Sequence, residues 1–99
     1  MDVIGKLKPF LDETGRVKQM PAKRKMQKLV LWYLANQLPA GPYAERELNE
    51  LLLAQHTFCD PCTLRRDLYD SGFLDRTPDG RRYWKREDPP TLAQLGWED

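Results

Sequence analysis

Apolar residues recur at intervals of three and four along two stretches of the chain, and this spacing is typical of amphipathic helices. The first stretch predicts a helix from Pro21 to about Gln37, with a buried face of Met26, Leu29, Val30, Tyr33 and Leu34. Leu31 and Trp32 widen that face, so this helix is expected to be central. The second stretch predicts a helix over about 45–55, with a stripe of Leu48, Leu51 and Leu52.

A third helix is marked mainly by its ends. Asp60 is a favourable N-cap residue, and Pro61 then takes the first helical position, where a missing N–H costs nothing. Gly72 supplies the stop, because glycine readily adopts the left-handed conformation that ends many helices. We therefore expect a short helix over 61–70, whose buried face carries Leu64 and Leu68.

Turn signals predict two hairpins. The tetrapeptide Thr77-Pro78-Asp79-Gly80 separates two short strands at 73–76 and 81–85. Residues 10–18 have the pattern of a shorter hairpin about a polar turn. A helix followed at once by a basic hairpin is the layout of a winged helix-turn-helix. The predicted fold is therefore α+β, mostly α: a winged helix-turn-helix-like three-helix core with a C-terminal β-hairpin wing and a short N-terminal hairpin.

The chain of 99 residues is expected to form a single domain, with a winged-helix-like core at 10–86 and an acidic C-terminal tail at 87–99. No apolar run approaches the ~20 residues that a membrane-spanning helix needs, so no membrane partner is expected. The first ten residues lack the apolar region of a signal peptide, which predicts a cytoplasmic location.

Charge is distributed in blocks, although the net charge is only +1. Residues 1–30 carry eight basic and three acidic side chains, and residues 61–86 carry seven and four. Residues 31–60 carry one and four, and the tail carries four acidic side chains and no basic ones. Two basic blocks around an acidic middle favour a polyanionic partner such as double-stranded DNA. Ordinary solvated faces explain the pattern equally well.

The beginning of the first helix is unusual. Cations in a first helical turn are disfavoured by the helix dipole by roughly 0.3–1 kcal/mol each, so an anionic ligand would account for them. We expect phosphate contacts from the basic residues of this segment, Lys23, Arg24, Lys25 and Lys28.

The helix over 61–70 carries the candidates for reading base edges: Thr63, Arg65 and Arg66. A structural interpretation competes with this one, because Arg66 can pair with Asp70 at i,i+4 and Asp67 reduces the positive field further. The wing adds three candidates for backbone contacts, Arg81, Arg82 and Lys85. Strand alternation puts Arg82 on one face of the hairpin with Trp84, and Arg81 on the other with Tyr83 and Lys85. The two aromatic rings are interpreted as packing residues.

Cys59 and Cys62 form a C-x-x-C motif, and His56 lies three residues before it. These three side chains suggest zinc or thiol redox chemistry, but a structural zinc site needs four ligands and the chain has no further Cys or His. We expect no metal and no cofactor, and we interpret His56 as a turn or core-edge residue. No catalytic set is visible, so an enzyme is not expected.

Two resemblances carry the interpretation further. The segment TLRRDL at 63–68, followed closely by Gly72, resembles the recognition helix and wing of deoxyribonucleoside-repressor-type regulators, where a similar helix enters the DNA major groove. Only three residues separate Leu68 from Gly72, about one turn fewer than in that family, so the helix should be short.

The second resemblance covers roughly residues 10–86, through the segments FLDETGRVKQMPAKRK, YAERELNELL and HTFCDPCTLRRDLYDSGFLDRTPDGRRYWK. Together they are similar to the bacterial domain-of-unknown-function family numbered 2087, which occurs alone or behind arsenic-repressor-type DNA-binding domains. The family usually has Thr or Ser as a helix cap where this chain has Ala44. The resemblance implies a winged-helix-like fold and a link to transcription.

Two functions remain open. The first is a winged-helix domain that binds DNA, with the helix over 61–70 toward the major groove and the wing over 76–86 on the backbone. The alternative is a protein-interaction or dimerisation domain of a transcription regulator, without direct DNA contact, whose partner is another regulator or a second copy. The basic cluster at 23–28 favours the first function, and the two acids of the helix over 61–70 favour the second.

Overall fold

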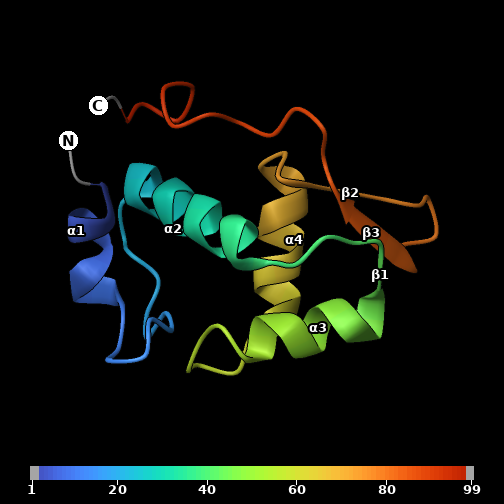
Figure 1. The fold of residues 1–99 in the computed structure, drawn as a ribbon, viewed down its shortest axis with the longest axis horizontal. Coiled ribbons are helices and arrows are strands. Elements are labelled where there is room, and N and C mark those ends of the chain that lie inside the picture. The colour runs from blue at the N-terminus through green and yellow to red at the C-terminus, as the bar shows by residue number, and fades with distance from the viewer. Residues whose placement is uncertain (1–2, 98–99) are drawn as a thin grey trace.

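The long helix α2 (Arg24–Gln37) lies at the centre of the domain, and the computed structural model, which describes residues 3–97, packs the other elements around it (Figure 1). Its buried residues are Leu29, Val30, Leu31, Leu34 and Ala35. The expected start at Pro21 is wrong, because Lys23 has an extended backbone (ψ 132°) and acts as the N-cap. The side-chain amide of Gln27 donates to the Pro21 carbonyl oxygen (2.9 Å), which holds residues 21–23 in a bend outside the helix.

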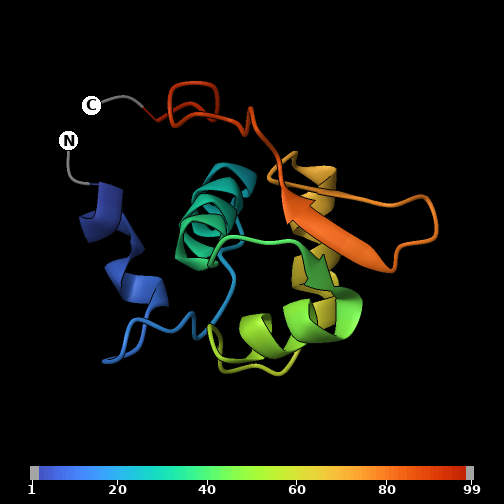
Figure 2. The same ribbon diagram turned by 45° about the vertical axis from the view of Figure 1, so that its right-hand side comes forward.

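The elements follow the order expected of a winged helix. Two short N-terminal turns come first, α1 (Val3–Leu7) and the 3-10 turn η1 (Lys8–Phe10). After α2 come β1 (Tyr43–Ala44), α3 (Glu45–Leu53), α4 (Pro61–Asp70), β2 (Leu74–Arg76) and β3 (Arg82–Lys85). The strands form an antiparallel sheet in the order β1-β3-β2, and the β2–β3 hairpin projects beyond α4 as a wing (Figure 2). The predicted α+β fold class is confirmed.

Strand β1 was not predicted, because two residues after Pro42 show no alternation that a pattern could detect. It exists through its pairing with β3, in which Tyr43 lies opposite Tyr83 and Ala44 opposite Arg82. Tyr43 and Tyr83 are both buried at 3% exposure, so the sheet closes over the core where β1 and β3 meet. The leucines of three helices fill that core beneath it: Leu29, Leu34, Leu48, Leu52, Leu64 and Leu68.

Helix α3 begins where the sequence predicts, with Ala44 as its N-cap. The side chain of Glu47 accepts a hydrogen bond from the Ala44 backbone N–H at 3.0 Å, which is one half of a capping box. The other half is missing, since alanine has no side-chain oxygen to accept the backbone N–H of Glu47.

Completing this capping box should stabilise the domain. We expect Ala44→Ser to raise the free energy of unfolding by ~0.5–2 kcal/mol, because the new hydroxyl accepts an N–H that is otherwise left without a partner in the first turn. Thermal unfolding followed by circular dichroism measures the effect, and Ala44→Val, which adds bulk but no acceptor, is the control. A melting temperature that falls with serine would contradict the assignment of the cap.

The expected N-terminal hairpin is reduced to a single bridge between Leu11 and Val17, with no strand on either side. The side chain of Asp12 accepts the backbone N–H groups of Thr14 and Arg16 (both 2.9 Å), so the turn curls too tightly for a longer ladder. Val17 also bridges His56 in parallel. The segment therefore serves to attach the N-terminal region to the loop before α4.

The C-terminal segment runs back along α2 and docks on it (Figures 1 and 2). Thr91 and Gln94 form reciprocal side-chain to backbone bonds (2.9 and 3.2 Å) that begin a helical turn. Trp97 is buried at 8% exposure, and its indole N–H donates to the Lys25 carbonyl oxygen at 3.2 Å. The predicted helical turn therefore forms and packs on the body of the domain. Of the tail's four acids, Glu98 and Asp99 lie outside the described residues.

Candidate nucleic-acid interface

Helix α4 is positioned by the local signals that the sequence contains. The carboxylate of Asp60 accepts the Thr63 backbone N–H at 3.3 Å, and Gly72 ends the region with a φ of +87°. Leu64 and Leu68 are buried, which turns the opposite face of the helix outward. The exposed residues of that face are Cys62, Thr63, Arg66 and Asp70.

Arg65 points into the fold and is not available as a base reader. Its guanidinium group lies 3.3 Å from the Glu45 carboxylate and donates a hydrogen bond to the Asn49 side chain. It also lies 5.8 Å from the centre of the Tyr83 ring, and the side chain is only 16% exposed. Arg65 therefore joins α4 to α3 and β3, and its predicted role in reading DNA is corrected to a structural one.

Arg66 faces outward, as a reading residue should. Within the described residues it forms no ion pair, so the pairing with Asp70 that the sequence allows does not occur. Thr63 is exposed one turn earlier on the same helix. Of the three predicted base readers, two remain accessible.

Asp67 of α4 is partly buried where this helix faces α2, and the burial changes the pKa of its carboxyl group. Burial raises its pKa above the usual value for an aspartate, and the negative charges of Asp70 and Asp60 raise it further, against a smaller opposing effect of Arg66. Because the pKa is higher in the folded state than in the unfolded chain, ionised Asp67 destabilises the fold above its folded pKa. That cost disappears as the pH falls below the unfolded pKa of about 4.

Neutralising Asp67 should therefore stabilise the domain in a pH-dependent manner. We expect Asp67→Asn to melt at a higher temperature than the wild type at pH 7, and the difference to vanish as the pH approaches 3. Melting curves between pH 3 and 8 test this, with the exposed Glu13→Gln as control. A difference that is independent of pH would show that the charge of Asp67 is not its cause.

The four basic residues at the start of α2 divide into two groups. Lys25 lies under the tail, with its ammonium group 4.6 Å from the centre of the Trp97 ring. Arg24 and Lys28 line a hollow of about 230 Å³ whose other side is formed by Asp67 and Asp70 of α4. The predicted cluster thus lies beside the exposed face of α4, but Lys25 is already engaged by the tail. Lys23 is the exposed N-cap.

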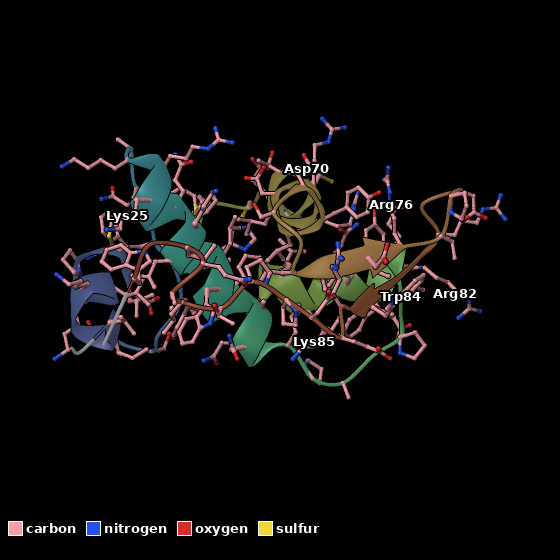
Figure 3. The ribbon with its side chains drawn as sticks, turned by 90° about the horizontal axis from the view of Figure 1, so that it is seen from above. Lys25, Asp70, Arg76, Arg82, Trp84 and Lys85 are labelled. Carbon is pink, nitrogen blue, oxygen red and sulfur yellow. The ribbon has the colours of Figure 1, made fainter. Side chains whose placement is uncertain are left out.

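The wing residues face in different directions, as the alternation predicts. Tyr83 is buried, whereas Arg82 and Trp84 are exposed on the opposite face of β3. The packing role expected for Trp84 is wrong, since its side chain is 38% exposed. Figure 3 shows Arg82 and Trp84 on the side of the sheet away from Asp70 and Arg76, whereas Lys85 belongs to the Tyr83 face by alternation. Arg82 therefore does not share a surface with α4, and Lys85 lines a groove beside α2 instead.

Arg81 lies at the tip of the wing, next to the turn that Asp79 organises. The Asp79 carboxylate accepts the Thr77 hydroxyl at 2.6 Å and the Arg81 backbone N–H at 3.0 Å. These bonds hold the pKa of Asp79 below its usual value. The Arg81 side chain is 84% exposed, and its guanidinium group lies 3.8 Å from the same carboxylate. An ion pair this exposed does not hold the guanidinium group firmly.

Sequence reasoning missed Arg76, the last residue of β2. Its guanidinium group lies 4.4 Å from the centre of the Tyr69 ring of α4. Hydrogen bonds with Tyr83 and Tyr69 raise the pKa of the guanidinium group. Nothing in the local sequence brings residues 69 and 76 together, because the contact depends on how the wing folds back against α4. Arg76 adds a cation beside the exposed face of that helix (Figure 3).

His56 is a core residue whose ring nitrogens both bond to the backbone. Nδ1 lies 2.6 Å from the Leu52 carbonyl oxygen, and Nε2 accepts the Asp60 backbone N–H at 2.8 Å. These partners assign the proton to Nδ1, since a carbonyl oxygen can only accept. Among residues 3–97 no three His, Cys, Asp or Glu side chains converge as a metal site. Within the same range, no helix has the length and apolar character needed to cross a membrane.

The helices, the three-stranded antiparallel sheet and the projecting hairpin define a mostly helical α+β domain. Residues 16–85 match the model of a bacterial family described as an uncharacterized protein conserved in bacteria (DUF2087). Because this match covers well over half of the chain, the protein belongs to that family. No curated protein and no solved structure matches the chain.

Proposed function

We propose that this domain acts in the bacterial cytoplasm as a DNA-binding module of transcription regulation, without catalytic chemistry, and that it contacts double-stranded DNA through one face. The observation that supports this best is the grouping of cations around the exposed side of α4. Arg24 and Lys28 border that helix on one flank, and Arg76 stacks on its Tyr69 on the other (Figure 3). Cations on both flanks of an exposed helix face suit the phosphate backbone.

The proposed contacts follow from exposure. Thr63 and Arg66 extend from α4 toward base edges in the major groove, since both side chains face solvent. Arg76 and Arg81 contact the backbone on the wing side, and the α2 cluster of Lys23, Arg24 and Lys28 contacts it on the other. Three of the predicted residues have no part in this interface. Arg65 faces the core, Arg82 faces the far side of the sheet, and Lys85 faces a groove beside α2.

A second function, docking on another regulator or on a second copy of the chain, is favoured by one observation. Asp67 and Asp70 lie between the two cationic flanks, and their charge opposes a polyanion at the centre of the face. The two functions respond oppositely to Asp70→Asn. Removing this carboxylate should tighten DNA binding several-fold at low salt, because a repulsive charge near phosphate is lost. Weaker association with a protein partner would instead favour the second function.

A titration with random-sequence 20-base-pair duplexes, followed by fluorescence anisotropy at 50 mM salt, tests the proposal. We expect the wild type to bind and Arg66→Ala to weaken binding about tenfold, through the loss of a charge-assisted contact. Arg46→Ala is the matched control, since Arg46 is an equally basic, highly exposed residue of α3 that the proposed face does not include. No binding by the wild type at this salt concentration would overturn the proposal.

A further inference from the structure

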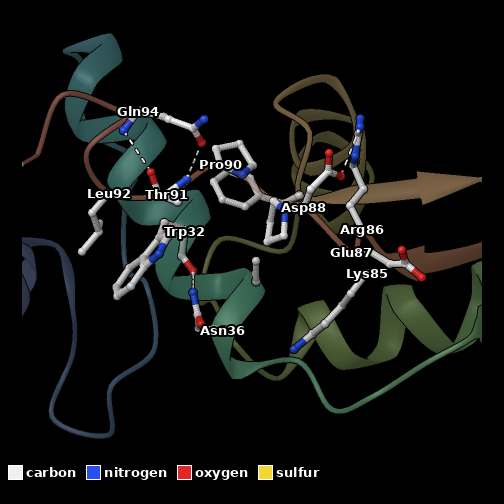
Figure 4. Close-up of a pocket in the computed structure, with 13 residues that line it drawn as sticks. Trp32, Asn36, Lys85, Arg86, Glu87, Asp88, Pro90, Thr91, Leu92 and Gln94 are labelled. Atoms are coloured by element: carbon white, nitrogen blue, oxygen red, sulfur yellow. Dashed lines mark hydrogen bonds and ion pairs between the residues drawn. The ribbon is translucent and has the colours of Figure 1, made fainter.

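A groove of about 730 Å³ lies between α2, the end of β3 and the C-terminal segment (Figure 4). Apolar side chains form part of its wall, among them Trp32, Phe73, Pro90 and Leu92, and charged side chains at 85–88 line one end. A volume of this size falls in the range of sites that bind small molecules, which are typically apolar with a few well-placed polar groups.

The groove is preformed, because both of its sides are held in place. Phe73 is buried at 2% exposure and belongs to the core, so the floor is rigid. The opposite side is the tail, whose turn is closed by the Thr91–Gln94 bonds and which the buried ring of Trp97 holds against α2. A ligand would therefore not need to order this segment before binding.

Two charged groups of the groove lack a partner among the described residues: the exposed Glu87 and the half-buried Lys85. Lys85 is half-buried at the end of β3, and Figure 4 shows its side chain extending toward α2. Within the described residues its ammonium group forms no hydrogen bond or ion pair. The neighbouring Arg86 is different, since it lies 3.5 Å from the Asp88 carboxylate. An unpaired cation beside an apolar wall complements an anion that carries an apolar body.

We propose that this groove binds a small aromatic carboxylate, with its ring against Trp32 and Leu92 and its carboxylate paired with Lys85. Trp32 is half-buried and presents an aromatic surface on which a planar ring can stack. The ligand's carboxylate supplies the partner that Lys85 lacks, in a site partly shielded from water, where an ion pair is stronger than at an open surface. This site lies apart from the face assigned to DNA, and its occupancy does not require DNA binding.

The test uses 2-naphthoate and its uncharged counterpart 2-naphthamide, titrated calorimetrically into the full chain. We expect 2-naphthoate to bind once per chain and to raise the melting temperature, and 2-naphthamide to bind about tenfold more weakly. Lys85→Met should weaken 2-naphthoate about tenfold and leave 2-naphthamide unchanged, because only the ion pair is removed. Lys18→Met, on the exposed N-terminal loop, is the matched control and should bind both compounds like the wild type.

A second variant keeps the test independent of the lysine. Asn36 lines the groove from the exposed side of α2, so Asn36→Phe should fill the space without disturbing the core and abolish binding of both compounds. Absence of saturable 2-naphthoate binding up to ~10 mM, an affinity range that weak small-molecule sites still reach, would overturn the proposal. It would also be overturned if Lys85→Met and Lys18→Met reduced the affinity equally, since that would indicate general attraction of an anion.

Discussion

Replacing Lys23, Arg24 and Lys28 together by alanine is expected to weaken duplex binding by about two orders of magnitude at 0.1 M salt. Each lysine or arginine that neutralises a phosphate contributes about 0.9 to the slope of log affinity against log salt concentration. The triple variant should therefore have a slope smaller by about 2–3, measured by anisotropy between 50 and 200 mM salt. Lys25 is left unchanged because it lies against Trp97.

The matched control removes the same number of charges elsewhere. Lys8, Lys18 and Arg46 are exposed and lie outside the proposed face, so their joint replacement by alanine should leave most of the salt slope intact. Loss of the α2 cations should not unfold the domain, since cations near a helix N-terminus are unfavourable and their removal adds stability. Equal losses of affinity in the two triple variants would mean that net charge alone governs binding, and would remove this cluster from the interface.

His56→Ala is expected to cause the largest loss of stability among single substitutions in the loop before α4. The ring is 1% exposed, and it bonds through both nitrogens to the backbone of Leu52 and Asp60. It also packs edge-on against Phe58, with 4.5 Å between ring centres. Losing two hydrogen bonds and leaving a cavity should cost about 2–4 kcal/mol, which lowers the melting temperature by at least about 8 °C in a domain of this size.

Two partial variants identify the cause. In His56→Asn the side-chain amide can donate to the Leu52 carbonyl oxygen in place of Nδ1. In His56→Gln the side-chain oxygen can reach the Asp60 N–H in place of Nε2. Each variant should therefore be more stable than His56→Ala but less stable than the wild type. The neighbouring exposed Thr57→Ala should change stability by less than about 0.5 kcal/mol. If alanine, asparagine and glutamine at position 56 all melted at the wild-type temperature, the ring would have no structural role.

Much of the layout of this domain was predictable from the sequence, because it depends on contacts between near neighbours. The start of α4 follows from Asp60 and Pro61, and its end follows from Gly72. The wing follows from the turn at 77–80, and the leucine stripes indicate the helices that carry them. Caps, turns and i,i+4 stripes act within a few residues, so the sequence contains their full cause.

Candidate site residues were predicted less well, because exposure depends on partners far along the chain. Arg65 has the same local sequence signal as Arg66, yet it faces Glu45 and Asn49, whereas Arg66 faces solvent. Arg76 joins the surface of α4 only because the wing folds back onto Tyr69.

The sequence by itself determined the ends of α4 and the position of the wing, through short-range capping, turn chemistry and hydrophobic periodicity, but it misplaced the start of α2. Only the tertiary structure decided which basic side chains share a face and that the tail closes a groove over Trp32. The physical reason is that these features arise from packing between segments 16 to 72 residues apart, such as Arg65 on Asn49 and Trp97 on Lys25. No local pattern encodes the direction in which a side chain faces once those segments meet.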